Sequence, residues 1–257
     1  DFKPEHIDFL KRKDVDISGL EIVKSGKTFH WAGHYLNNLN EAETLDTKLG
    51  VFEHFNPVLS EVQRELPILF LGNIHPQLQL KVLDQMNLPQ VVALDTMNLW
   101  INNERDALQQ VIERVNMMIV NDGEARLLTG ENNMTKAAMK IKSWGPKTVV
   151  IKRGEYGALL FHEDEVFVAP ALPLADVTDP TGAGDSFAGG FLGCLSRAGE
   201  VNEASLKRAA ILGSVMASFH VEDFGPERHN TLQSGEIEER FAHFKQISTF
   251  EHSSIFA

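Results

Sequence analysis

From Pro57 onward, short apolar runs alternate with segments of helical periodicity, and this alternation constrains the fold more than any other feature of the chain. The predicted strands cover residues 68–73, 91–95, 117–121 and 148–153, and the predicted helices between them cover 77–86, 104–115, 124–128 and 135–144. Such alternation is typical of a mostly parallel sheet flanked by helices. The sequence therefore predicts an α/β fold for this part of the chain.

The same part of the chain contains a hairpin and three later helices. Residues 157–161 and 165–170 are apolar runs joined by the acidic turn HEDE, which predicts two antiparallel strands. Helices are expected to begin near Gly182, Asn202 and Glu236. All of these elements are assigned to one main domain, residues 56–257.

The first 55 residues follow a different pattern. Residues 1–18 predict a helix and a connection, whereas residues 19–55 are rich in β-branched and aromatic side chains. Two runs, 28–35 and 44–52, are separated by an Asn-rich segment and predict a small antiparallel sheet, with Ser25 and Gly26 turning the chain into its second strand.

Composition limits the class of protein. The chain has 257 residues, 43% of them hydrophobic, and one cysteine, Cys194, so no internal disulfide can form. With 24 basic and 36 acidic residues the net charge is −12, and no Lys/Arg run carries interleaved aromatics, so we expect no binding to nucleic acid. No apolar stretch approaches the roughly 18–20 residues that span a bilayer, and the charged start lacks the apolar core of a secretion signal. We expect a cytoplasmic globular protein that binds no membrane.

Polar residues follow the predicted parallel strands. Asn73, Asp95, Asn121 and Arg153 each stand at or just after the end of one strand. Ligands of open α/β sheets bind at the carboxyl ends of the strands, so these side chains are candidates for a site. The alternative is that Asn and Asp serve there as turn and helix-cap residues.

The stretch DPTGAGDSFAGGF, residues 179–191, carries the clearest chemical signal. Small residues Gly182, Ala183 and Gly184 precede a helix, and backbone N–H groups at a helix start attract anions. No Lys follows the glycines and their spacing is wrong, so the pattern is neither a P-loop nor a dinucleotide fingerprint. Asp185 is then either a structural cap or, beside a bound phosphate, a base that accepts a proton from an attacking hydroxyl.

This stretch closely resembles the signature of the PfkB, or ribokinase-like, family of sugar and nucleoside kinases, and three further segments agree with the family in order. They are Asp95 with Asn98, Asn121 with Glu124, and Lys152 with Gly154 and Gly157. The resemblance covers nearly the whole chain. It implies a three-layer α/β/α sandwich with a mostly parallel sheet, and it identifies residues 19–55 as a small β-sheet lid over the substrate.

The resemblance also implies a mechanism. ATP phosphates would bind the backbone of Gly182, Ala183 and Gly184, while Asp185 takes the proton of a substrate hydroxyl that attacks the γ-phosphate. The nucleotide would lie near Asn121, Lys152, Gly154 and Gly157. Mg²⁺ would be held near Glu124, largely through water. A monovalent cation such as K⁺, bound by some family members, would use oxygens near Asp179 and Thr181.

The substrate is expected to contact residues of the lid and of the sheet edge. They are His30, Trp31, Asp95, Asn98 and Asp185. His30 and His34 could instead suggest a metal pair, but no third ligand follows at zinc-like spacing. The apolar lid residues Phe29, Trp31, Val51 and Phe52 would suit a homodimer formed through the lid.

Two features depart from the family pattern. Pro180 stands where Thr is frequent, which fixes the local φ angle without disturbing the glycines. The family's first strand, an early substrate-binding Asp and a Gly-Gly motif all precede the lid, so we expect the N-terminal part of the domain to be missing from this sequence.

Three functions fit these features. The favoured one is an ATP-dependent kinase acting on a hydroxyl of a sugar or sugar-like molecule, and a nucleoside kinase of the same family is the alternative. A catalytically silent binding or regulatory relative is the third, and the intact Asp185 and anion-binding glycines argue against it.

Overall fold

The computed structural model describes residues 1–35 and 42–250. The Asn-rich connection predicted between the two lid strands falls outside these residues. None of the helices in the described ranges is both long and apolar enough to cross a membrane.

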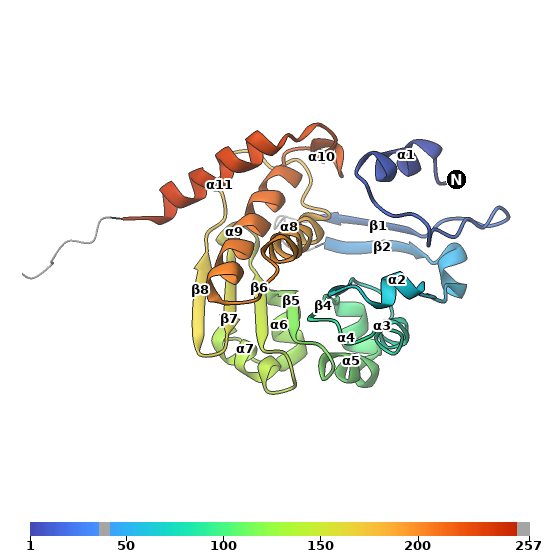
Figure 1. The fold of residues 1–257 in the computed structure, drawn as a ribbon, viewed down its shortest axis with the longest axis horizontal. Helices are drawn as coiled ribbons and strands as arrows, with labels where there is room; N and C mark the ends of the chain where they lie inside the picture. Colours follow the sequence, from blue (N-terminus) through green and yellow to red (C-terminus); the bar gives the residue numbers. More distant parts are fainter. Residues whose placement is uncertain (36–41, 251–257) are drawn as a thin grey trace, which may run out of the picture.

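A six-stranded sheet lies at the centre of the main domain, in the order β3-β4-β5-β6-β7-β8 (Figure 1). Its strands are β3 (Ile68–Leu71), β4 (Val91–Leu94), β5 (Met117–Asn121), β6 (Thr148–Lys152), β7 (Ala158–His162) and β8 (Glu165–Ala169). Strands β3 to β6 pair in parallel, and β7 and β8 continue the sheet as an antiparallel hairpin. The carboxyl ends of β3 to β6 therefore share one edge of the sheet.

Helices cover both faces of this sheet. The helices on one face are α3 (Pro76–Leu83), α4 (Asn98–Asn103), α5 (Arg105–Ile112), α6 (Asp122–Thr129) and α7 (Met134–Lys142), and those on the other are α8 (Ala183–Ala198) and α9 (Glu203–His220). The remaining helices are α1 (Pro4–Arg12), α2 (Glu61–Arg64), α10 (Glu227–Thr231) and α11 (Ser234–Ser248), with 3₁₀ turns η1 (Gly50–His54) and η2 (Gly154–Tyr156). The predicted sandwich of helices, sheet and helices is confirmed.

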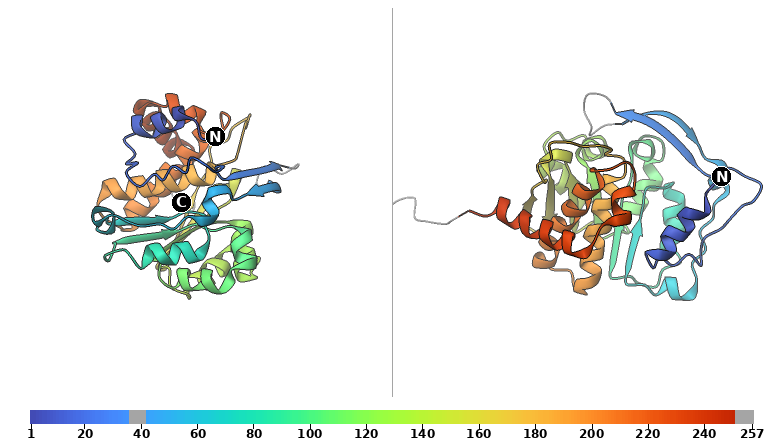
Figure 2. Two further views of the ribbon diagram at one scale, coloured as in Figure 1. Left: turned by 90° about the vertical axis from the view of Figure 1, so that its right-hand side faces the viewer. Right: turned by 90° about the horizontal axis from the view of Figure 1, so that it is seen from above.

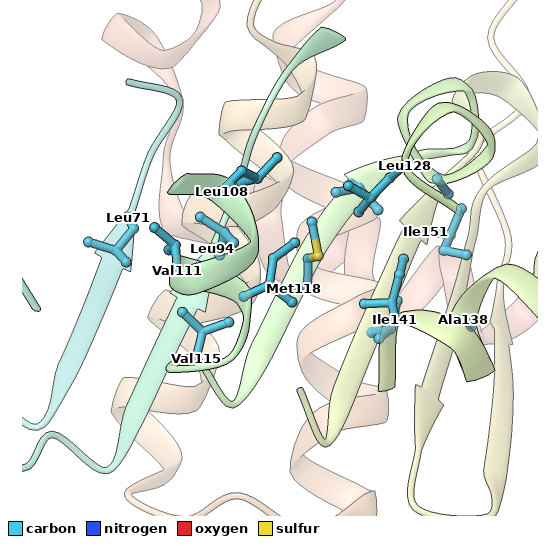
Figure 3. Packing of buried hydrophobic residues seen from close by; sticks show 14 of the residues in the cluster. Leu71, Leu94, Leu108, Val111, Val115, Met118, Leu128, Ala138, Ile141 and Ile151 are labelled. Atoms are coloured by element: carbon cyan, nitrogen blue, oxygen red, sulfur yellow. The ribbon is translucent and has the colours of Figure 1, made fainter. Parts of the chain in front are cut away.

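Burial on both faces explains why these strands read as continuous apolar runs. Every residue of β4 is buried, as are the first four residues of β5 and of β6. On one face Leu94 and Met118 pack with Leu108 of α5 and Ile141 of α7 (Figure 3). On the other face the sheet packs against α8 and α9, and the result is two apolar layers that fix the sheet edge carrying the polar residues.

The small sheet lies outside these three layers (Figure 2). It pairs β1 (His30–Tyr35) with β2 (Ala42–Lys48) antiparallel, with a bulge between Ala32 and Gly33. The second strand was predicted to reach residue 52, but it ends at Lys48, because the Val51 N–H turns back to the Lys27 carbonyl at 2.8 Å and the chain enters η1. Ser25 and Gly26 lie in the predicted turn, although no strand precedes them within residues 1–35.

The predicted elements of the main domain are all present, and their ends differ by a few residues. Helices α2, α4 and α10 were not predicted, because each is a single short stretch without clear apolar periodicity.

Candidate active site

The loop before α8 places a set of backbone N–H groups at one edge of the sheet. Gly182 is the N-cap of α8 and adopts φ +91°, a left-handed conformation that glycine tolerates. No side chain in the described part of the chain caps this helix start. Residues Gly182–Gly184 are called the anion loop below, because N–H groups at the start of a sixteen-residue helix favour an anion. The Ala183 N–H donates to the Pro180 carbonyl at 3.1 Å, and the N–H groups of Gly182 and Gly184 have no partner within the described residues.

Asp185 lies in the first turn of α8 with an exposed side chain. Its carboxylate makes no hydrogen bond or ion pair with any side chain or backbone group among residues 1–35 and 42–250, so it does not act as a cap. The structural alternative raised by the sequence is therefore not the arrangement observed.

Three charged side chains meet beside the anion loop, at the ends of β4, β5 and β6. Asp95 follows β4 and is 6% exposed, Glu124 lies in α6 and is 8% exposed, and Lys152 ends β6. The Lys152 Nζ lies 3.7 Å from Asp95 Oδ2, and Asp95 Oδ1 accepts a hydrogen bond from the Thr96 N–H at 2.8 Å. A Cβ added to Gly184 would lie 2.8 Å from Lys152 Nζ, so the ammonium group borders the anion loop.

The pKa values of the cluster shift because it is buried and carries more negative than positive charge. Burial, which is the largest influence, raises the pKa of Asp95, and the nearby Asp185 adds to this, while Lys152 opposes it. Burial alone would lower the pKa of Lys152, but the carboxylates of Asp95, Glu124 and Asp185 outweigh it and raise that pKa. Burial and the negative charge of Asp95 raise the pKa of Glu124 to about 7.

Asn121 and Glu124 hold one another in a capping box at the start of α6. The Asn121 Oδ1 accepts the Glu124 N–H at 2.7 Å, and Glu124 Oε2 accepts the Asn121 N–H at 2.7 Å. The Asn-x-x-Glu spacing is itself a capping signal, so the sequence offered this explanation as well as the nucleotide and metal roles. The capping box fixes the Glu124 carboxyl group toward Asp95 and Lys152, where it completes the cluster.

The pKa of Glu124 leads to a prediction about stability. The folded-state pKa of about 7 lies above the ordinary value of 4.5, so the folded protein binds more protons than the unfolded chain between these values. The free energy of unfolding should therefore fall as the pH rises from 4.5 through 7, by roughly 3 kcal/mol at most. We expect Glu124→Gln, which retains the capping oxygen, to be more stable than the wild type at pH 8 and to lose this slope.

Urea unfolding at pH 5 and pH 8 without divalent metal measures this effect. Glu239→Gln, on the exposed side of α11, is the matched control and should behave as the wild type. Parallel pH dependence in wild type and Glu124→Gln would refute the prediction.

Gly154 and Gly157, the glycines predicted to lie near the nucleotide, are also explained by the local backbone conformation. Gly157 adopts φ +80°, and a Cβ there would lie 2.1 Å from the Ala169 carbonyl oxygen, so the β6–β7 connection requires glycine. Gly154 begins η2 with φ +54°. The nucleotide-binding role of both residues remains a prediction.

Asp179 and Thr181, the predicted ligands of a monovalent cation, already have protein partners. Asp179 Oδ1 accepts the Thr181 N–H at 2.9 Å, and Oδ2 accepts the Gly225 N–H at 3.2 Å. Burial would raise the pKa of Asp179, but these hydrogen bonds outweigh it and lower that pKa. The Thr181 carbonyl faces His220, a residue that sequence reasoning did not single out, since nothing but its place near a helix end marks it.

The predicted substrate residues are only partly brought together. Asp95 lies in the cluster, whereas Asn98 is exposed at the start of α4. In the lid, Trp31 Nε1 donates to Thr44 Oγ1 at 3.1 Å, and His30 lines a separate cavity of about 450 Å³ with residues of α1. Within the described residues, Tyr35 joins the lid to the residue just before the anion loop, because its hydroxyl accepts a hydrogen bond from Thr181 Oγ1 at 3.2 Å. The sequence indicated Tyr35 only as a lid aromatic that could cover the substrate, and it gave no sign of the contact with Thr181, because the two residues are 146 positions apart.

Two of the remaining candidates have partners of their own. Asn73 accepts a hydrogen bond from Trp100 Nε1 at 2.8 Å, and Arg153 stacks on the Tyr156 ring at 5.7 Å. In the lid, Phe29 packs against Phe52 with 6.0 Å between ring centroids, so part of the apolar surface predicted for a dimer contacts itself. The homodimer stays a prediction.

Metal binding by protein side chains alone finds no support in the described residues. They contain no group of three or more His, Cys, Asp or Glu side chains placed to hold a metal ion. A buried carboxyl group with a raised pKa, such as Glu124, nevertheless fits a divalent cation that is held mainly by phosphates and water.

Comparison with known proteins agrees with this fold. The family model described as "pfkB family carbohydrate kinase" matches residues 81–231. The cytidine kinase of Thermococcus kodakarensis is 33% identical over 210 residues, which cover 79% of this chain and 73% of that protein. The nucleoside kinase of Methanocaldococcus jannaschii is 24% identical over 217 residues, covering 84% of this chain and 68% of that protein.

Solved structures share the fold. The M. jannaschii nucleoside kinase superposes with a TM-score of 0.73 at 21% identity, covering 93% of this chain and 76% of that chain. A putative ribokinase II from E. coli, in complex with ATP and Mg²⁺, gives a TM-score of 0.73 at 21% identity over 93% of this chain and 79% of that one. The predicted ribokinase-like fold is confirmed. Since the family model spans more than half of the chain and a relative above 30% identity covers most of both proteins, the chain belongs to the pfkB family of carbohydrate kinases.

Proposed function

We propose that the chain transfers the γ-phosphoryl group of ATP to a hydroxyl of a sugar or sugar-like molecule, with Asp185 as the general base. The observation that carries this proposal is the Asp185 carboxylate, which has no partner in the described residues and stands one residue after the anion loop. A carboxylate placed beside bound phosphate repels it, and this cost is offset only if the group accepts a proton from the attacking hydroxyl.

The anion loop and Lys152 would bind and neutralise the phosphates. Phosphoryl transfer depends chiefly on positioning and on stabilising negative charge on the transferring oxygens. The N–H groups of Gly182 and Gly184, together with the Lys152 ammonium group that borders Gly184, would supply both. The Asp95 carboxylate, with Oδ2 at 3.7 Å from Nζ, forms an ion pair with that ammonium group and helps to hold it in place.

Glu124 is the residue that would hold Mg²⁺, through water, and the metal would supply positive charge that neutralises part of the phosphate charge. The carboxyl group of Glu124 is fixed by its capping box, and burial together with the negative charge of Asp95 raises its pKa. Near phosphate and metal, this carboxyl would be ionised, because a nearby cation favours the charged form.

The lid would exclude water from the reacting hydroxyl. The Tyr35–Thr181 hydrogen bond joins β1 to the residue just before the anion loop. Closure of the lid would therefore affect the position of the phosphate site. This would limit transfer of the phosphoryl group to water when no acceptor is bound.

A nucleoside is the second candidate for the acceptor. The relative with 33% identity is a cytidine kinase, and other relatives are nucleoside kinases. In such a substrate the phosphorylated group would be a hydroxyl of the ribose, so the chemistry at Asp185 is unchanged. The nucleobase of such a substrate would then contact the lid, where the aromatic ring of Trp31 could stack on it.

A panel of sugars and nucleosides, each tested as the acceptor with ATP and Mg²⁺, decides between a sugar kinase and a nucleoside kinase. We expect ADP formation above background only with one structural group of acceptors, either free sugars or nucleosides, measured by a coupled ADP assay. Trp31→Ala should raise KM for a nucleoside by about tenfold if the base stacks on the ring, and should change KM for ATP little. ADP formation that no member of the panel stimulates would contradict the kinase proposal.

A further inference from the structure

Behind the anion loop, His220, Ser186 and His229 form a hydrogen-bonded cluster that has no part in the chemistry of Asp185. His220 ends α9 and is 6% exposed. Its Nε2 lies 2.6 Å from the carbonyl oxygen of Thr181, and its Nδ1 lies 2.9 Å from Ser186 Oγ. Thr181 precedes the anion loop and Ser186 follows Asp185, so one buried side chain contacts the backbone before the loop and the helix after it.

The direction of the key hydrogen bond follows from its acceptor. A carbonyl oxygen only accepts, so Nε2 of His220 carries the hydrogen in the neutral and in the protonated ring. Nδ1 then faces Ser186 Oγ and, at 3.2 Å, His229 Nε2, which itself lies 3.1 Å from Ser186 Oγ. Each of these groups has a partner inside the cluster, and the N–H of His220 is thereby aimed at Thr181.

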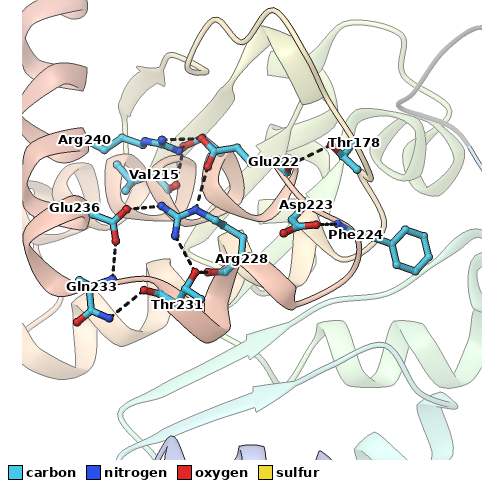
Figure 4. A network of polar contacts seen from close by, with 11 residues as sticks. Thr178, Val215, Glu222, Asp223, Phe224, Arg228, Thr231, Gln233, Glu236 and Arg240 are labelled. Atoms are coloured by element: carbon cyan, nitrogen blue, oxygen red, sulfur yellow. Dashed lines mark hydrogen bonds and ion pairs between the residues drawn. The ribbon is translucent and has the colours of Figure 1, made fainter.

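The segment that carries His229 and Gly225 is fixed by a network of charged side chains (Figure 4). Glu222 accepts from Arg228 Nε at 3.2 Å and from Arg240 Nη2 at 2.6 Å, and Arg228 also bonds Glu236. This network joins the end of α9 to α10 and α11. The donors that reach Thr181 and Asp179 are therefore held in place by three elements.

These donors occupy the oxygens that the family resemblance would offer to a monovalent cation. The Asp179 carboxylate accepts the N–H groups of Thr181 and Gly225, and the Thr181 carbonyl accepts from His220. N–H hydrogens carry partial positive charge, so a cation bound at the same oxygens would be repelled by them. The residues of this chain therefore do not fit a monovalent cation at Asp179 and Thr181.

We propose that His220 takes the place of a monovalent cation: its Nε2–H holds the Thr181 carbonyl and so fixes the anion loop for phosphate without K⁺ or Na⁺. His220 is a positioning residue, because it acts through Thr181 and Ser186. The proposal rests on the kinase function proposed above.

Changing the monovalent cation in the assay tests the claim that the anion loop needs no bound K⁺ or Na⁺. ADP formation by the wild type is measured with Mg²⁺ in KCl, NaCl or tetramethylammonium chloride at equal ionic strength. We expect kcat to differ by less than about twofold among the three salts, because no bound ion is exchanged. The melting temperature with ADP should likewise shift by less than about 1 °C between KCl and tetramethylammonium chloride.

Two variants of His220, with side chains of nearly equal size, test the claim that its Nε2–H positions the anion loop. His220→Gln can place an amide N–H where Nε2 lies, whereas His220→Met fills the space without a donor. We expect kcat of His220→Met to fall by about tenfold or more, with KM for the acceptor little changed, because a misplaced anion loop weakens the transition state. His220→Gln should retain kcat within about threefold. His243→Met, on the exposed face of α11, is the control.

Distinct results overturn the distinct claims. Activation of the wild type by K⁺ of about tenfold or more, or a K⁺-dependent rise in melting temperature, would refute the absence of a cation site. Equal kcat in the folded His220→Gln and His220→Met variants would refute the positioning role. Absence of acceptor-dependent turnover in the wild type under every salt would instead contradict the kinase function itself.

Discussion

Asp185→Asn should lower kcat by about a thousandfold, because a positioned general base contributes roughly 10²–10⁴-fold in such reactions. Asparagine keeps the size and the helix position but cannot accept the proton of the attacking hydroxyl. The affinity for ATP should stay the same or increase, since the substitution removes a negative charge beside the phosphates. Single-turnover kinetics and calorimetric ATP binding separate these two effects.

Asp176→Asn is the matched control, as Asp176 is another exposed aspartate in the loop before the anion loop. It should retain wild-type kcat. The outcome that would contradict a catalytic Asp185 is an Asp185→Asn variant with kcat within about threefold of the wild type.

Lys152→Met should lower kcat/KM for ATP by about 10²–10³-fold, the usual loss when one preorganised donor is removed from developing negative charge. The physical reason is the position of Nζ, which borders Gly184 and forms an ion pair with Asp95. The substitution also leaves the Asp95 carboxylate buried without its cation, so a loss of about 3–5 kcal/mol in the free energy of unfolding is expected.

The Lys152→Arg variant separates the effect on activity from the effect on stability. It retains the charge and hence most of the stability, but its guanidinium group cannot occupy the position of Nζ, so we expect an intermediate loss of activity. Thermal unfolding monitors the fold of both variants. A folded Lys152→Met variant with wild-type kcat/KM for ATP would show that the ammonium group serves the fold alone.

The main domain could be predicted from sequence because its signals are local. Strands β4, β5 and β6 are buried on both faces and therefore appear as continuous apolar runs, and the Gly182–Asp185 motif carries its helix start within a few residues. The end of β2 was missed because a backbone contact between Lys27 and Val51, far apart in sequence, decides it.

Features of the site that depend on distant contacts could not be predicted. The Lys152–Asp95 pair joins two strands, and the Tyr35–Thr181 and His220–Thr181 contacts join segments that carry no shared motif. Hydrophobic periodicity contains no information on such polar pairs. In contrast, the capping box of Asn121 and Glu124 has a recognised spacing in the sequence. The structure was needed only to show that Glu124 also belongs to the buried charge cluster.

The most direct test of the central claim follows the γ-phosphoryl group of ATP to its acceptor by ³¹P NMR, with Mg²⁺ and the acceptor chosen from the panel. We predict one phosphate monoester on an acceptor hydroxyl for each ADP formed, and no such product with Asp185→Asn. Formation of inorganic phosphate in place of the ester, or ester formation that is unchanged in Asp185→Asn, would contradict a kinase in which Asp185 activates the acceptor hydroxyl.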